Sequence, residues 1–126
     1  MSGFEELAST VTELFHVSCR FECEPSLLVE NDLAATHLYR IAQEAITNAI
    51  THGKSKNIVL RLSGKGGKTS LSVEDDGIGF PDNVEPGAGM GLRIMKYRAE
   101  IIGAILDVRR KDPKGTIVTC EAETSR

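Results

Sequence analysis

The sequence contains no tryptophan, few other aromatic residues and only three cysteines in 126 residues. An odd number of cysteines excludes a fully paired disulfide framework. The sequence also lacks the paired CxxC spacing that would indicate a zinc site. Cys19 and Cys23 would lie about 13 Å apart on one strand, too far for a disulfide or a shared metal ion. No apolar run approaches the roughly 20 residues of a transmembrane helix, and the first residues do not follow the order of a signal peptide. We therefore expect a cytoplasmic domain with buried thiols and no membrane contact.

The chain also lacks a strong excess of charge of either sign. Fifteen basic and eighteen acidic residues give a net charge of -3, which argues against a nucleic-acid partner. An anionic ligand would therefore have to be bound by local features. The length and the 40% hydrophobic content predict one compact domain, residues 1–126.

Hydrophobic periodicity predicts an α+β fold. Amphipathic helices are expected over residues 4–14, from a cap at Asn31 or Asp32 to Gly53, and over 92–103. Strands are expected at 17–23, 56–63, 68–75, 104–110 and 115–123. The buried stripe of the first helix is predicted to contain Phe4, Leu7, Val11 and Leu14. This order predicts a two-layer sandwich, in which helices cover one face of a mixed, mostly antiparallel sheet.

Two glycine-rich segments resemble nucleotide-binding motifs without matching them. GKGGKT (64–69) has Leu62 where a phosphate loop requires its first glycine, and a strand rather than a helix follows it. GAGMG (87–91) is not preceded by the strand of a dinucleotide-binding fingerprint. It does end where a helix is predicted to begin, so free N–H groups could bind polyphosphate at Gly89, Gly91 and Leu92. The alternative is a mobile loop without a ligand.

Polar side chains recur at every fourth residue along the helix that carries RIAQEAITNAITHG (40–53). Arg40, Glu44, Asn48 and His52 would stack along one edge, where they could contact a single ligand. Asn48 offers an oxygen suited to Mg²⁺, and Glu44 could accept a proton from a nucleophile. An ordinary solvated helix edge is the alternative.

Strand alternation directs one carboxylate toward the core. Asp75 shares a face with Leu71 and Val73, and Thr116 shares a face with Val118, Cys120 and Ala122. A buried carboxylate requires donors, so Asp75 and Thr116 together suit a flat heterocycle with an exocyclic amine, such as adenine. Gly77 and Gly79 would let that ring approach the backbone closely. Alternatively, Asp75 ends its strand and caps the turn at Gly77.

Four segments, in order, resemble the N, G1, G2 and closing Gly-Thr boxes of the ATP-binding domain of sensor histidine kinases. They are QEAITNAITHG, DDGIGF, GAGMGLRIMKYRAEIIGA and GTIVTC. The Gln-Glu start of the first box and the GLRIMKYRAE helix are most similar to the NarX/DesK type. The resemblance covers roughly residues 33–123 and implies a Bergerat-type fold, shared with DNA gyrase, the mismatch-repair ATPase and the ninety-kilodalton heat-shock chaperone. The boxes (31–123) would follow an N-terminal helix and strand (1–30).

The resemblance also implies roles for the residues that match the boxes. Asn48 would bind Mg²⁺, Glu44 would be the general base, and Asp75 would accept a hydrogen bond from the adenine amine with support from Thr116. His52 would lie near the phosphates. Gly77 and Gly79 would shape the adenine pocket. Gly89 and Gly91 would belong to the ATP lid, residues 76–91, which covers the phosphates.

Two departures from the family pattern stand out. Thr51 occupies a position where the family often has lysine. His52, Arg93 or Lys96 could compensate, although Arg93 and Lys96 are first expected to be ordinary surface residues. The phosphoacceptor histidine of the family lies on a separate helical hairpin upstream, and none of His16, His37 and His52 has its setting. We therefore expect a monomeric catalytic fragment that does not phosphorylate itself.

The implied activity is phosphoryl transfer from Mg·ATP to that hairpin, and from there to a response regulator. A nucleotide-gated interaction module, similar to an anti-sigma factor, would keep the same pocket. A structural domain that has lost nucleotide binding is the third alternative.

Overall fold

The computed structural model describes residues 2–23, 32–65, 67–78, 90–111 and 114–123. The helices are α1 (Ser2–Phe15), α2 (Asp32–Thr51) and α3 (Met90–Ile101). The strands are β1 (Ser18–Cys23), β2 (Asn57–Lys65), β3 (Lys68–Asp75), β4 (Ile105–Arg110) and β5 (Thr116–Glu123). Each of these elements lies within a few residues of its predicted position. The predicted mobile loop falls mostly outside the described residues, since 79–89 are not among them.

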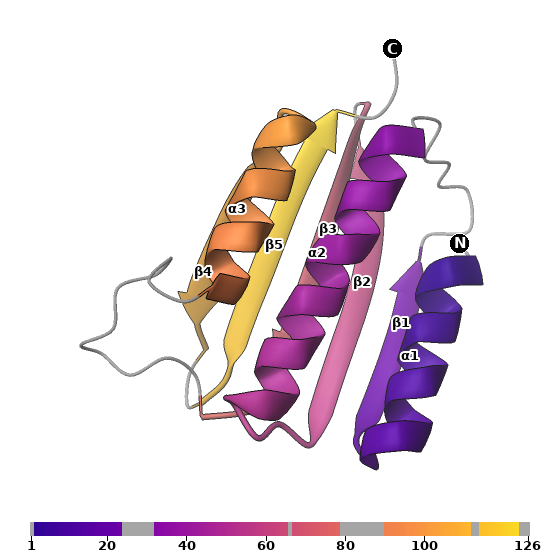
Figure 1. Ribbon diagram of the computed structural model, residues 1–126. Coiled ribbons are helices and arrows are strands. Elements are labelled where there is room, and N and C mark those ends of the chain that lie inside the picture. Colours follow the sequence, from indigo (N-terminus) through magenta and orange to yellow (C-terminus); the bar gives the residue numbers. More distant parts are fainter. Residues whose placement is uncertain (1, 24–31, 66, 79–89, 112–113, 124–126) are drawn as a thin grey trace.

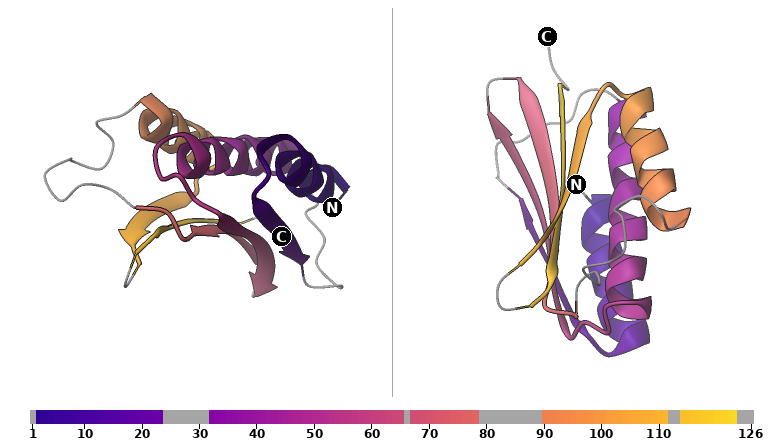
Figure 2. Two further views of the ribbon diagram at one scale, coloured as in Figure 1. Left: turned by 90° about the horizontal axis from the view of Figure 1, so that it is seen from below. Right: turned by 90° about the vertical axis from the view of Figure 1, so that its left-hand side faces the viewer.

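The five strands form one sheet in the order β1-β2-β3-β5-β4. β1 and β2 pair in parallel, whereas the other neighbours pair antiparallel. A parallel pair needs a long crossover connection, and α2 lies within the one between these two strands. The helices lie side by side over one face of the sheet (Figure 1), and a side view separates the two layers (Figure 2). These observations confirm the predicted α+β two-layer sandwich.

The hydrophobic core lies between α2 and the middle of the sheet. The apolar face of α2 is buried at three- and four-residue spacings, as its periodicity predicts. The strands contribute every second side chain to the same core. Its largest fully buried apolar side chains are Leu38, Ile41, Ile46, Ile58, Leu60, Leu62, Leu71, Val73, Met95 and Cys120. Within the described part of the chain, no helix is long and apolar enough to span a bilayer.

The orientation of α1 differs from the prediction at its last turn. Leu14 is 67% exposed, whereas Phe4, Ala8 and Val11 are buried. The Thr12 hydroxyl accepts a hydrogen bond from the backbone N–H of Cys19, at 3.1 Å, and fixes the end of α1 against the start of β1. Because this contact points the Thr12 side of α1 toward β1, Leu14 turns away from the core, and the prediction that it is buried was wrong.

Candidate functional site

The polar edge of α2 meets the first turn of α3. Glu44 and Asn48 are both half-buried, and Gly91 faces them across the contact between the two helices. A Cβ atom on Gly91 would lie 2.9 Å from Asn48 Nδ2, closer than real Cβ atoms come to other atoms, and 3.1 Å from Glu44 Oε2, a tight contact. The absence of a side chain therefore lets the α3 backbone approach an amide and a carboxylate. The structure brings together these three residues predicted from the sequence.

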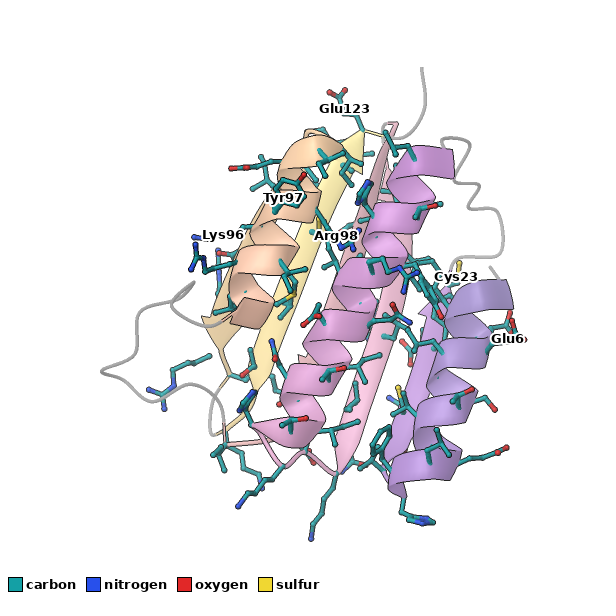
Figure 3. All side chains as sticks on the ribbon, viewed as in Figure 1. Glu6, Cys23, Lys96, Tyr97, Arg98 and Glu123 are labelled. Carbon is teal, nitrogen blue, oxygen red and sulfur yellow. The ribbon has the colours of Figure 1, made fainter. Side chains whose placement is uncertain are left out.

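The first turn of α3 is held in place by the core. Leu92 is buried, so its side chain is an anchor, and only its backbone N–H remains as the anion-binding group predicted for it. Further along α3, Arg98 points toward α2, and its Nη1 lies 3.2 Å from His37 Nδ1, whereas Lys96 points away from α2 (Figure 3). Arg93 and Lys96 are exposed, in agreement with a surface position.

Only part of the predicted polar edge of α2 lies at the contact with Gly91. Arg40 donates a hydrogen bond to Gln43 Oε1 at 2.9 Å and lies about 12 Å along the helix from Asn48. His52 is exposed in the turn that follows the helix, next to the exposed Thr51. Glu44 and Asn48 are therefore the two members of the edge that face Gly91.

Asp75 lies at the opposite end of the site, where β3 ends. Its side chain is buried, and Thr116 faces it directly across the β3-β5 register. Asp75 Oδ1 accepts hydrogen bonds from the backbone N–H of Gly77 at 2.8 Å and from Ser55 Oγ at 2.9 Å. The carboxylate faces inward as strand alternation predicts, and it also caps the turn at Gly77, so the two alternatives are compatible.

The turn after Asp75 packs tightly against the connection between α2 and β2. The N–H of Ile78 donates to the carbonyl of Gly53 at 2.8 Å. A Cβ atom on Gly77 would lie 2.5 Å from Ser55 Oγ and closer still to the Gly53 carbonyl oxygen. Only glycine fits there without moving this backbone. The other two predicted glycines of the pocket and lid, Gly79 and Gly89, lie outside the described residues.

Asp76 is a structural partner of the site that the sequence analysis did not identify. Its Oδ1 accepts the backbone N–H groups of Lys56 at 2.9 Å and Asn57 at 3.0 Å, and its Oδ2 accepts Asn57 Nδ2 at 2.7 Å. Partial burial tends to raise the pKa of Asp76, but these hydrogen bonds, with that from the Asn57 side chain foremost, lower it to about 2. Successive residues of an extended chain point to opposite sides, so Asp75, the last residue of β3, faces the core, and Asp76, which follows β3, binds the start of β2.

Comparisons with known proteins identify the family of the chain. Residues 34–126 match the family described as histidine kinase-, DNA gyrase B-, and HSP90-like ATPases. The chain belongs to this family, which confirms the resemblance identified in the sequence.

Its relatives are sensor kinases. The chain is 32% identical over 104 residues to the nitrate/nitrite sensor protein NarX of Escherichia coli, which covers 82% of this chain and 17% of NarX. It is 35% identical over 117 residues to a sensor protein NarQ homolog of Haemophilus influenzae, which covers 90% of this chain and 20% of that protein. The chain thus spans about a fifth of the length of these curated relatives.

Solved structures share the fold. The histidine kinase domain of the Erythrobacter litoralis EL346 blue-light activated histidine kinase superposes with a TM-score of 0.80 at 26% identity, covering 94% of this chain and 58% of that one. The ATP binding domain of PrrB from Mycobacterium tuberculosis gives a TM-score of 0.79 over 99% of this chain and 93% of that one. At 16% identity, the second comparison supports the fold alone.

Proposed function

We propose that this chain is the ATP-binding catalytic domain of a sensor histidine kinase. It would bind Mg·ATP and transfer the γ-phosphoryl group to a histidine on a separate hairpin domain, which in turn would supply a response regulator. The observation that carries the proposal is the placement of Glu44 and Asn48 against Gly91 near the C-terminal end of α2, with the buried Asp75 just beyond that same end. ATP binding is what membership of the family implies.

The adenine end of the site fits the base by its hydrogen-bonding chemistry. Asp75 is an acceptor in a buried setting, and Thr116 adds a hydroxyl on the same side of the sheet. Adenine carries an exocyclic amine that donates, so the buried carboxylate would gain the donor that its burial favours. The tight turn at Gly77 packs against Gly53 and Ser55 beside it.

The phosphate end of the site fits a magnesium-bound triphosphate. Asn48 supplies an amide oxygen, which is a hard ligand suited to Mg²⁺, and the first turn of α3 offers N–H groups and the positive end of its dipole to phosphate. Mg²⁺, when bound, would neutralise charge on the phosphate oxygens. The described lid residues, 76–78 and 90–91, and the exposed His52 would complete the site.

In the proposed reaction the imidazole nitrogen of the acceptor histidine attacks the γ-phosphorus. A nitrogen–phosphorus bond forms, the bond to the bridging oxygen breaks, and ADP leaves with the electron pair. Glu44 is assigned to accept the proton that the imidazole loses, since its carboxylate lies beside Gly91 where the phosphates are expected. The acceptor nitrogen must also approach the γ-phosphorus in line with the bond to the leaving oxygen of ADP. Binding of the hairpin domain must provide this orientation.

A groove of about 380 Å³ lies between α1 and α2, on the side of α2 away from α3 (Figure 1). Its walls include the apolar side chains of Val11, Phe15, Ile46 and Ile50, and Glu44 lines the same groove. A helix of the phosphoacceptor hairpin lying in this groove would therefore bring its histidine toward Glu44. An apolar groove suits the apolar face of an amphipathic helix.

The test is transfer from γ-labelled ATP to a separately expressed phosphoacceptor hairpin. The chain alone should acquire no acid-labile label, and addition of the hairpin should produce labelled hairpin. Glu44→Gln should slow the transfer by about 10²- to 10⁴-fold, the usual contribution of a general base, with ATP affinity nearly unchanged. Glu100→Gln, which alters an exposed residue of α3, is the matched control and should transfer at the normal rate.

The outcomes separate the proposal from its rivals. Transfer at full rate by Glu44→Gln would remove Glu44 as the base. Tight ATP binding without any transfer by the unaltered chain would favour the nucleotide-gated interaction module. Failure to bind ATP would favour a structural domain.

A further inference from the structure

Ser55 lies beneath the adenine end of the site and has no role in the mechanism above. It follows α2, in the connection to β2, and its side chain is 4% exposed. Its Oγ donates to Asp75 Oδ1 at 2.9 Å, across twenty residues of sequence. Its own backbone N–H is fixed by the carbonyl of Ala49 at 2.9 Å, so the hydroxyl is held in place by the end of the helix.

Two donors converge on one oxygen of the Asp75 carboxylate. The Gly77 N–H and the Ser55 hydroxyl both reach Oδ1, and among the described residues no hydrogen bond to Oδ2 accompanies them. A carboxylate held by two donors from different segments cannot rotate freely about its last side-chain bond. The second oxygen therefore keeps one direction, and it can only accept a hydrogen bond there.

From this geometry we infer that Ser55 is a positioning residue for base selection, acting through Asp75. This inference rests on the proposed ATP site and adds to it the residue that fixes which carboxylate oxygen faces the base. A base with a donor at its C6 position, such as adenine, gains from that fixed acceptor. A base with a carbonyl at C6, such as hypoxanthine, places two acceptors against each other.

The residues around Ser55 prevent its hydroxyl from moving away from the Asp75 carboxylate. Its Oγ lies where even a Cβ atom on Gly77 would clash, so the Ser55 side chain and the Gly77 turn are packed against each other. The preceding residue, Lys54, has a φ of +53°, which marks a sharp change in chain direction immediately before Ser55. The hydroxyl is thus presented by a tightly constrained turn rather than by a loose loop.

The experiment compares Ser55→Ala with the unaltered chain by calorimetry, using ATP, the triphosphate of purine riboside, which lacks the C6 amine, and ITP, which has a carbonyl there. Ser55→Ala should weaken ATP binding by roughly three- to tenfold, the loss expected for one hydrogen bond, and should leave the purine riboside triphosphate within about twofold. The preference for ATP over ITP should fall by a similar factor. In an Asp75→Asn background, Ser55→Ala should have no further effect on ATP binding.

Two controls separate positioning from simple loss of structure. Ser72→Ala removes a hydroxyl from β3 on the face of the sheet that the helices leave open, and it should alter no nucleotide affinity. Ser55→Cys keeps a side-chain donor, although a weaker and somewhat larger one, and should give an intermediate ATP affinity if Ser55→Ala folds poorly.

Equal weakening of ATP and of the amine-lacking triphosphate would overturn the inference, because a structural role would affect both. Unchanged ATP affinity in Ser55→Ala would also overturn it. Both results require that the unaltered chain binds ATP, whereas its failure to bind any of these nucleotides would contradict the proposed function itself.

Discussion

The Asp76 carboxylate connects the end of β3 with the start of β2, and Asp76→Asn should destabilise the domain measurably. Three hydrogen bonds to this carboxylate lower its pKa from 3.8 to about 2. Because each unit of pKa corresponds to about 1.4 kcal/mol, the lowered value corresponds to at most about 2.5 kcal/mol. The side chain is half-buried, so solvent screening reduces the expected loss to about 1 to 2 kcal/mol.

The same pKa fixes how this loss depends on pH. A carboxylate whose pKa is lower in the folded state stabilises that state above its unfolded pKa, near 3.8, and loses this contribution as the pH falls toward 2. The difference in unfolding free energy between the unaltered chain and Asp76→Asn should thus be full at pH 6 and shrink progressively below pH 4. Urea unfolding followed by circular dichroism at several pH values measures this difference.

Asp107→Asn is a suitable control for the Asp76 experiment. Asp107 lies on β4, about half-exposed, in an ion pair with Arg109, and such surface pairs contribute at most about 1 kcal/mol. A stability difference for Asp76→Asn that is equally large at pH 6 and pH 3 would refute the electrostatic reasoning, as would no difference at pH 6.

Two further predictions concern nucleotide binding. Asp75→Asn presents a donor toward the amine of adenine, and a mismatched buried polar pair costs about 1 to 3 kcal/mol, so calorimetry should show ATP affinity reduced by about 5- to 150-fold; equal affinity would remove Asp75 from the site. Asn48→Ala should weaken ATP binding in the presence of Mg²⁺ and change it little under a chelator, because the lost contact is to the ion; a defect of the same size in both conditions would indicate helix packing instead.

Patterns with a regular period were sufficient to predict much of the fold and part of the site. Alternation along β3 and β5 placed Asp75 and Thr116 on the buried face, and the register pairs them directly. Four-residue spacing on α2 placed Glu44 and Asn48 on one edge, and both face α3 through Gly91. In each case the direction of the side chain follows from the backbone geometry of a single element.

Contacts that depend on connections were not predictable in this way. Helical spacing allows Leu14 to continue the buried stripe of α1, and only the contact of Thr12 with β1 shows that Leu14 turns away, whereas Leu7 packs partly buried against the core as predicted. Ser55 and Asp76 bind partners about twenty residues away through the irregular α2-β2 connection. No periodicity constrains that connection, so its hydrogen bonds become visible only in three dimensions.

The end of α2 links the two halves of the proposed site. The side chain of Asn48 faces Gly91, while its carbonyl accepts the N–H of Gly53 at 3.0 Å, and the Gly53 carbonyl in turn accepts the N–H of Ile78. Three consecutive backbone or side-chain contacts thus join the phosphate end to the turn that follows Asp75. Because α2 is buried along its length against the sheet, the spacing between the two ends is set by the core rather than by the lid. We therefore expect adenine selection to be largely preformed, and regulation by a partner to act on the first turn of α3 or on the groove beside Glu44.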